Sequence, residues 1–230
     1  MYKTFLSKVS LFAGLPWGSL KKLAAMAKER SFRKNEVIYQ PQEPESVLFV
    51  VQQGKVKLAV GDGHSKEIIL YIIGEGEFFG EASLLDGPSM SWTATALEPC
   101  RTFVIPREPF RRFVQNNPTV LMKLSSALAA RLCRTERKIS RLVLADAYEK
   151  VASVLLDALE EKELPLKQGA EIPLSLRRRE LAGLVGVSRE TFTRVIGAFQ
   201  KAGLVRVNNR SIAVINPARL RREATRSICV

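Results

Sequence analysis

The sequence has few of the side chains from which metal sites and catalytic centres are built. Its 230 residues include one histidine, His64, and three cysteines, Cys100, Cys133 and Cys229, which form no CxxC pair. Zinc and iron–sulfur sites need clustered cysteine or histidine, so we expect no metal site. No nucleophile is paired with a base, so we do not expect an enzyme. An odd number of cysteines indicates a reducing compartment and therefore the cytoplasm.

Long apolar runs are also missing. No stretch approaches the ~18 apolar residues of a membrane span. Met1 to Gly14 lacks the long apolar run and the cleavage site of a secretory signal. We therefore expect no membrane partner. With 46% hydrophobic and 26% charged residues, the 230-residue chain can still build real cores in one large or two modest domains.

What the sequence has in excess is positive charge, most of it near the C-terminus. The net charge is +13, and the 57 residues from Leu174 to Val230 hold 12 Lys and Arg against 3 acids, which leaves +9 in that segment. A basic segment on a structured domain is typical of nucleic-acid binding. The alternative is a solvated basic surface that serves only solubility.

The first part of the chain, to about Pro118, is rich in short strand-like runs. A helix is expected after Pro16, because apolar residues follow it at helical spacing. The runs Val47–Val60, Glu67–Glu81 and Ser91–Ile105 contain many β-branched and aromatic residues and are interrupted by glycine or proline. Many short strands with evenly spaced turns predict a barrel or a sandwich.

A long helix is predicted next, from about Thr119 to Leu144, because no proline or glycine interrupts a regular apolar stripe there. The steps along the stripe are three and four residues, close to a heptad seam. The stripe could pack on its own domain or on a second copy. We expect a symmetric dimer seam, since twofold dimers are the commonest oligomers. The seam residues are Leu121, Leu124, Leu128, Leu132, Thr135, Ile139 and Leu142.

The last part of the chain predicts a winged helix-turn-helix. A short helix, Arg178 to Val185, is followed by the turn Gly186-Val187-Ser188 and by a second helix from Arg189 to about Ala202. The segment after Gly203 alternates apolar and polar residues like a β-hairpin. Helix, glycine turn, helix and hairpin is the order of elements in this DNA-binding motif.

The start of the second helix carries the residues that we expect to read DNA. Apolar side chains form its inner face, which leaves the outward residues to meet base edges in the major groove. Arginine suits guanine, and glutamate accepts from the N4 of cytosine. We expect base contacts from Arg189, Glu190, Thr193 and Arg194. Contacts to phosphates position a protein on DNA without selecting a base sequence. We expect such contacts from Arg177, Arg178, Arg179, Ser188, Thr191 and Arg210.

These motifs resemble a known family. The stretch GVSRETFTR, Gly186 to Arg194, is similar to the recognition-helix motif of the cyclic-AMP receptor protein/FNR family of bacterial transcription regulators. VQQGKVKL and GEFFGEASLLDG resemble the β-roll sensor of that family. The resemblance implies an α+β fold in three parts. These are a jelly-roll-like β-roll of the cyclic-nucleotide-binding type at 1–118, a dimerisation helix and hinge at 119–145, and a winged helix-turn-helix DNA-binding domain at 146–230.

The resemblance also implies a homodimeric, sequence-specific regulator controlled by a small effector in the β-roll. Arg189, Glu190 and Arg194 match the residues with which receptor-protein members read TGTGA-type half-sites, and FNR-type members lack the arginine at 189. Arg177 departs from the Thr or Ser that usually opens the first helix, which puts its cap in doubt. The implied partners are double-stranded DNA, a second copy, the effector and, for an activator, RNA polymerase.

The sensor cassette departs from the family at one important place. In cyclic-nucleotide members, a Gly-Glu pair binds the ribose and a later Arg-Ser binds the cyclic phosphate. Gly80-Glu81, Ser91 and, on the long helix, Thr135 match, but Met90 replaces the arginine. An unpaired phosphate in a partly dry pocket is unfavourable, so cyclic AMP is disfavoured. The expected pocket comprises Gly80, Glu81, Ala82, Met90, Ser91, Trp92, Leu128 and Thr135.

Three further alternatives stay open at this point. Met90 and Trp92 either line an apolar pocket for a less charged effector or fill that pocket. A haem- or gas-sensing member of the same family is an alternative, since haem needs one side-chain ligand, such as His64, and an apolar cleft. A non-specific architectural DNA-binding protein is another, although Glu190 facing DNA would weaken binding that has no base readout.

Overall fold

The computed structural model describes residues 2–41, 43, 47–61, 67–86, 91–160, 165–173, 176–208 and 211–225. The chain divides into two compact units. The N-terminal unit comprises Met1–Val60 and Leu70–Cys133, and the C-terminal unit comprises Gly61–Ile69 and Arg134–Val230. The three-part division of the chain at residues 118 and 145 stays a prediction.

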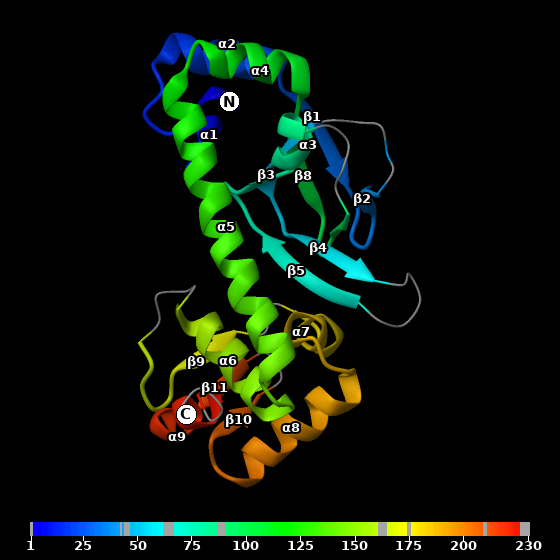
Figure 1. The fold of residues 1–230 in the computed structure, drawn as a ribbon, viewed down its shortest axis with the longest axis vertical. Coiled ribbons are helices and arrows are strands. Elements are labelled where there is room, and N and C mark those ends of the chain that lie inside the picture. The colour runs from blue at the N-terminus through cyan, green and yellow to red at the C-terminus, as the bar shows by residue number, and fades with distance from the viewer. Residues whose placement is uncertain are drawn as a thin grey trace. The chain divides into compact units, whose positions relative to one another are not determined.

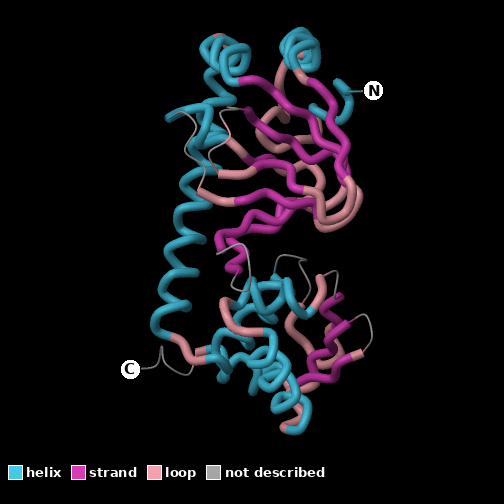
Figure 2. The backbone as a smooth tube through the Cα atoms, turned by 90° about the vertical axis from the view of Figure 1, so that its right-hand side faces the viewer, coloured by secondary structure: helices cyan, strands magenta, loops and turns pink. Residues whose placement is uncertain are grey.

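Within the described residues, two sheets build the β-roll that the glycine-punctuated runs predicted. Their strand orders are β1-β8-β3-β6 and β2-β7-β4-β5. The pairs β1–β8, β3–β8, β3–β6, β2–β7 and β4–β7 are antiparallel, and the strands are stacked as layers (Figures 1 and 2). The strands are β1 (Lys28–Phe32), β2 (Val37–Tyr39), β3 (Val47–Gln53), β4 (Val56–Gly61), β5 (Glu67–Ile73), β6 (Phe78–Phe79), β7 (Thr93–Ala96) and β8 (Cys100–Pro106).

Two apolar cores hold the N-terminal unit together. The first contains residues of both sheets, and in it Phe49 and Phe79 stack across the β3–β6 pair with 4.7 Å between ring centroids. The second joins residues of the sheet β1-β8-β3-β6 to those of the surrounding helices. Burial of these aromatic and branched side chains is the main stabilising contribution to the roll. The second core includes Leu6, Phe12, Leu20, Leu23, Leu48, Phe103, Phe110 and Leu124.

The helices of the N-terminal unit are α1 (Tyr2–Leu6), α2 (Trp17–Met26), α3 (Glu81–Asp86), α4 (Arg107–Gln115) and the beginning of α5 (Pro118–Leu144). α2 begins directly after Pro16, as predicted. α2 and α4 lie side by side at one end of the roll (Figures 1 and 2). The short helix α3 was not predicted, because the sequence run that contains its first residue was interpreted as strand.

Helix α5 confirms the long helix, but one part of the predicted seam is wrong. Leu124 is only 1% exposed and lies in the second core of its own unit, and Leu128 is half-buried against that core. Spacing marks an apolar face of a helix but does not identify the body that covers it. Leu121, Leu132 and Ile139 of the predicted seam are exposed, by 45%, 60% and 55%.

The C-terminal unit has the predicted order of elements. α6 (Ala147–Glu160) precedes α7 (Arg178–Val185) and α8 (Arg189–Lys201), and β10 (Val205–Val207) pairs antiparallel with β11 (Ser211–Val214). The third strand, β9 (Glu171–Pro173), pairs with β11. A last helix, α9 (Pro217–Ala224), follows the hairpin. One core joins these elements through Val151, Leu155, Ile172, Phe192, Val195, Phe199, Leu204, Ile212, Val214 and Leu220.

Gly80 joins β6 to α3 in a conformation that suits only glycine. Its φ is +90°, and a Cβ at this position would lie 2.4 Å from the carbonyl oxygen of Val47. We expect Gly80→Ala to lower the free energy of unfolding of the N-terminal unit by roughly 2–4 kcal/mol, from left-handed strain together with a backbone clash. Gly76→Ala is the control, because its φ is +80° and nothing lies within 4 Å of its Cβ. Urea unfolding followed by tryptophan fluorescence measures both, and equal losses would contradict the expectation.

Candidate DNA-reading surface and effector pocket

The turn between α7 and α8 is built around Gly186. This residue is left-handed, with φ +75°, and its amide donates to the carbonyl oxygen of Ala182 at 2.9 Å. A Cβ at Gly186 would lie 2.2 Å from Cδ2 of Leu142, so the side chain of Leu142 occupies the space that the glycine leaves. The turn therefore sets the direction of α8 and also receives the last turns of α5.

Helix α8 presents its predicted faces. Phe192, Val195, Ile196 and Phe199 are buried, as the spacing predicted. Ser188 caps the helix, because its hydroxyl oxygen accepts from the amide of Thr191 at 3.1 Å. A satisfied cap fixes the first turn, which is the part of a recognition helix that approaches bases. The predicted base-contact residues Arg189, Glu190, Thr193 and Arg194 are all exposed on the opposite side.

Two of these residues already have partners within the helix. The hydroxyl of Thr193 donates to the carbonyl oxygen of Arg189 at 2.9 Å. The pKa of Glu190 lies below its usual value, because the carboxylate accepts its own backbone amide and the hydroxyl of Ser188. Glu190 is therefore ionised near neutral pH, which is the state in which it can accept a hydrogen bond from a cytosine amino group.

The predicted phosphate contacts have different local structures. Arg177, Arg178 and Arg179 are exposed at the start of α7, and Arg177 occupies the N-cap position without a side-chain cap bond, as its departure from Thr or Ser indicated. The hydroxyl oxygens of Thr191 and Ser188 lie 3.1 Å apart, so Thr191 lies against the cap. Arg210 lies outside the described residues.

Glu81, the predicted effector-binding carboxylate, is a buried charge with an internal partner. It opens α3, is 7% exposed, and forms an ion pair with Arg131 of α5. Arg131 also donates to the carbonyl oxygen of Phe78. It lies over the rings of Phe78 and Tyr71, at 5.0 Å and 5.8 Å from their centroids. The second carboxylate oxygen of Glu81, Oε2, is buried and has no hydrogen-bond partner among the described residues.

Arg131 was missed at the level of the sequence. The one available signal was its position on the long helix, one turn before Thr135, the residue matched to the family's cassette. Its partner lies 50 residues earlier in the chain, and no local pattern connects the two positions. The arginine expected at position 90 is replaced by Met90, but the carboxylate of the cassette still has an arginine beside it.

Trp92 packs into the interior of the roll. Its ring lies edge-to-face with Tyr39 at 5.8 Å and with Phe79 at 6.1 Å between centroids. Burial raises the pKa of Tyr39, so its phenol is neutral in this environment. This packing favours the interpretation in which Trp92 fills space in the roll.

The remaining predicted pocket residues belong to both compact units. Gly80 and Ala82 flank Glu81 in the chain, and Ala82 is exposed. Ser91 is exposed, and Thr135 is half-buried in the part of α5 that belongs to the C-terminal unit. Met90 and His64 lie outside the described residues.

The two cysteines that the structure describes lie in different environments. The Cys100 thiol is buried and donates to the carbonyl oxygens of Lys55 and Glu98, both at 3.1 Å, and burial raises its pKa. A thiol with a raised pKa is a poor nucleophile. Cys133 is exposed on α5. In the described ranges, no group of three or more His, Cys, Asp and Glu side chains could hold a metal ion. No helix in those ranges is long and apolar enough to cross a membrane.

Comparison with known protein families identifies both halves of the chain. Residues 29–117 match the family model of the cyclic nucleotide-binding domain. Residues 149–223 match that of the Crp-like helix-turn-helix domain. The first match includes the β-roll with Glu81, and the second includes α7, α8 and the hairpin.

Individual relatives extend over most of the chain. The cAMP-activated global transcriptional regulator CRP of Pasteurella multocida is 33% identical over 183 residues, which cover 79% of this chain and 86% of that protein. The CRP-like cAMP-activated global transcriptional regulator of Mycobacterium tuberculosis is 26% identical over 95% of this chain and 98% of its own length. The structure of the c-di-GMP responsive global regulator CLP of Xanthomonas campestris matches with 27% identity and a TM-score of 0.75, covering 87% of this chain and all of that one. The chain thus belongs to the CRP/FNR family of bacterial transcription regulators, which are DNA-binding proteins and not enzymes.

Proposed function

We propose that the protein is a homodimeric regulator that binds palindromic DNA with TGTGA-like half-sites under the control of a small effector in the β-roll. One observation carries the DNA-reading part: Arg189, Glu190 and Arg194 are exposed together on the first turns of a helix whose start is fixed by the Ser188 cap. We place this activity in the cytoplasm, where DNA is available, with RNA polymerase as a further partner if the protein activates transcription.

The test of this proposal compares binding to three duplexes at the same stated salt concentration: a TGTGA palindrome, a TTGAT palindrome and a scrambled sequence. We expect the TGTGA duplex to bind most tightly. Its affinity should exceed that of the scrambled duplex by a factor of about 10³ or more, the typical ratio of specific to non-specific binding. Equal binding to all three would instead support a non-specific architectural protein.

The dimer is supported by an exposed apolar face on α5. Met122, Leu132, Ile139 and Val143 are exposed by 68%, 60%, 55% and 75%, which is unusual for large apolar side chains. They fall on one heptad pattern, which shares Leu132 and Ile139 with the seam predicted in the sequence and differs from it by one residue at the other positions. We infer that this face meets its twofold copy. The complete inferred seam is Met122, Ser125, Ala129, Leu132, Glu136, Ile139 and Val143.

Leu132→Asp is expected to convert the dimer into monomers. The substitution removes two leucines from a twofold seam and introduces two charges, so the dissociation constant should rise about 1,000-fold or more. Sedimentation velocity over a concentration series measures the change. Ala130→Asp is the matched control, because Ala130 is exposed on the same helix but lies roughly 130° away around the axis from the middle of this seam. A dimer that persists in Leu132→Asp would refute the seam.

For the effector, we propose a ligand that carries less negative charge than a cyclic nucleotide. The relatives are described as cAMP-activated or c-di-GMP responsive, which makes those two nucleotides the ligands to compare first. Met90 leaves a cyclic phosphate without the arginine that pairs with it, and the resulting loss is several kcal/mol. Haem is the second candidate, and an absorption spectrum of protein purified from its own host would reveal it.

Titration calorimetry should therefore detect no micromolar binding of cyclic AMP to the protein. The matched variant, Met90→Arg, restores the phosphate partner of the cassette and should improve the affinity for cyclic AMP by about 100-fold or more, since a charge-assisted contact in a dry site contributes about 3 kcal/mol. Micromolar binding of cyclic AMP to the unmodified protein would overturn the proposed change of effector.

A further inference from the structure

The last helix of the C-terminal unit carries charge that its packing does not use. In α9, Leu220 is fully buried and Ala224 is 9% exposed, so one stripe attaches the helix to the core. Arg219, Arg221 and Arg222 are all exposed. Asn216 caps the helix, its side-chain oxygen accepting from the amide of Arg219 at 3.0 Å. The buried stripe and the Asn216 cap therefore attach the helix without using Arg221 or Arg222.

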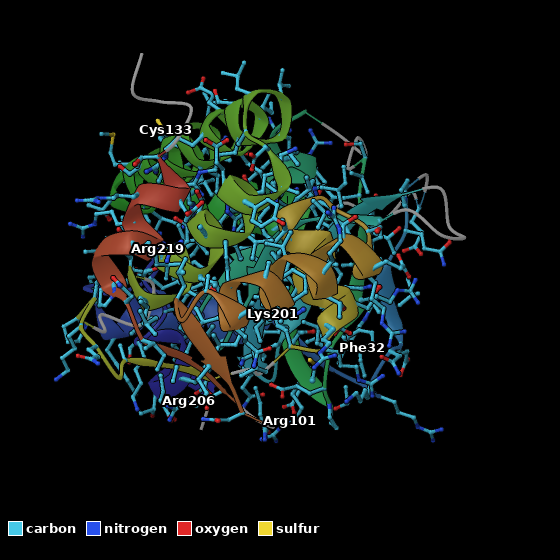
Figure 3. All side chains as sticks on the ribbon, turned by 90° about the horizontal axis from the view of Figure 1, so that it is seen from below. Phe32, Arg101, Cys133, Lys201, Arg206 and Arg219 are labelled. Carbon is cyan, nitrogen blue, oxygen red and sulfur yellow. The ribbon has the colours of Figure 1, made fainter. Side chains whose placement is uncertain are left out.

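α9 lies beside the C-terminal end of the DNA-reading helix α8. A guanidinium nitrogen of Arg219 donates to the carbonyl oxygen of Ala202, the residue after Lys201, at 3.4 Å. β10, which carries the exposed Arg206, lies between α8 and α9 (Figure 1). Viewed from below, Lys201, Arg206 and Arg219 lie on α8, β10 and α9, on the side of the C-terminal unit that faces the viewer (Figure 3).

The arginines of α9 do not all point the same way. With about 100° between successive residues of a helix, Arg219 and Arg222 are roughly 60° apart, whereas Arg221 is roughly 160° from Arg219. We call the set Lys201, Arg206, Arg219 and Arg222 the α9 basic face. Arg221 lies outside it and provides an internal comparison.

The excess of positive charge between Lys201 and Thr225 favours an anionic binding partner. From Lys201 to Thr225 the sequence holds six Lys and Arg against one acid, Glu223. A helix dipole explains a cation in the last turn of a helix, as with Lys201 and Arg222. It does not explain Arg206 on a strand, and it disfavours Arg219 in the first turn of α9. Like charges held together repel one another, so their grouping is stabilised when an anion lies between or across them.

We propose that the α9 basic face binds the phosphate backbone of the same duplex whose bases are read by the start of α8. Lys201 is 12 residues beyond Arg189, which is about 18 Å along the helix axis and corresponds to about five base pairs of DNA. The face therefore meets phosphates that the first turn of α8 does not reach. This surface widens the contact with DNA and adds affinity without adding sequence preference. The inference rests on the DNA-binding function proposed above.

The test measures DNA affinity as a function of salt for matched variants. The slope of log K against log salt concentration is negative, and each lost phosphate contact reduces its magnitude by about 1. We expect Arg219→Gln/Arg222→Gln to reduce this magnitude by about 2 per protomer and Arg206→Gln alone by about 1. Arg221→Gln removes a charge from the same helix and should change the slope far less. The losses should be equal on the TGTGA palindrome and on the scrambled duplex.

The outcomes separate this inference from the proposed function. If the unmodified protein does not prefer its palindrome, the sequence-reading proposal fails, and the slopes of the variants still decide whether the face binds phosphate. If the double variant and Arg206→Gln have the slope of Arg221→Gln, the inference is overturned. Unchanged DNA affinity with loss of transcription activation would also overturn it, because the face would then serve a protein partner. Circular dichroism checks that each variant is folded, and Arg206→Gln tests the face without touching the Arg219–Ala202 contact.

Discussion

Replacing Arg189 with alanine is expected to remove most of the preference for a TGTGA palindrome. Arg189 is exposed in the first turn of α8, directly after the Ser188 cap, where an arginine can donate two hydrogen bonds to the O6 and N7 atoms of guanine. Each such pair contributes about 1–3 kcal/mol of discrimination. A palindrome contains two half-sites, so the ratio of specific to non-specific affinity should fall by roughly 30-fold to 10,000-fold.

The comparison that makes this result specific is Arg178→Ala. Arg178 is exposed at the start of α7 and is proposed to contact phosphate. Its removal should weaken binding to the palindrome and to the scrambled duplex by the same factor. Competition binding at one salt concentration measures both ratios. If Arg189→Ala behaves like Arg178→Ala, Arg189 contacts the backbone and not a base.

The second large effect is expected at the ion pair between Glu81 and Arg131. Arg131→Met leaves the carboxylate of Glu81, which is 7% exposed, without its positive partner. Breaking a buried pair in this way costs about 3–5 kcal/mol, because the remaining charge stays desolvated. The N-terminal unit should therefore unfold at a clearly lower urea concentration. Both tryptophans, Trp17 and Trp92, belong to this unit, so their fluorescence reports on it.

A double variant separates the ion pair from the other contacts of Arg131. Arg131 also donates to Phe78 and lies over two aromatic rings, and both of these contacts are lost in either variant. In Glu81→Gln/Arg131→Met neither position carries a charge, so most of the lost stability should return. If the double variant is as unstable as Arg131→Met, the packing of the arginine matters and its charge does not.

The DNA-reading half of the molecule was largely predictable because its signals are local. Gly186 is left-handed in the predicted turn, α8 begins at Arg189 as predicted, and α7 spans the predicted residues Arg178 to Val185. Caps, glycine turns and helical spacing act within a few residues of one another. Short-range physics is therefore enough to position Arg189 and its neighbours on the surface.

The sensor half was predictable only in outline, because its details depend on contacts between distant segments. The pairing of Glu81 with Arg131 joins positions 50 residues apart. Leu124 is apolar at heptad spacing, as a seam residue would be, but the core of its own unit covers it. The contacts of Trp92 are also made with distant segments, because its partners Tyr39 and Phe79 belong to β2 and β6. Sequence spacing contains no information about which of several apolar surfaces a side chain reaches.

The buried oxygen Oε2 of Glu81 has a consequence for the effector that we propose. Oε2 is buried and accepts no hydrogen bond from the part of the chain that the structure describes, and a buried polar atom in that state costs about 1–3 kcal/mol. An ionised carboxylate can only accept, so this free energy is recovered only by a group that donates, such as a hydroxyl or an amine. A ligand that offers only acceptors gains nothing there and meets like charge. We therefore expect the effector that we propose to present a donor group to Glu81, and a ligand built only of acceptors to be rejected there.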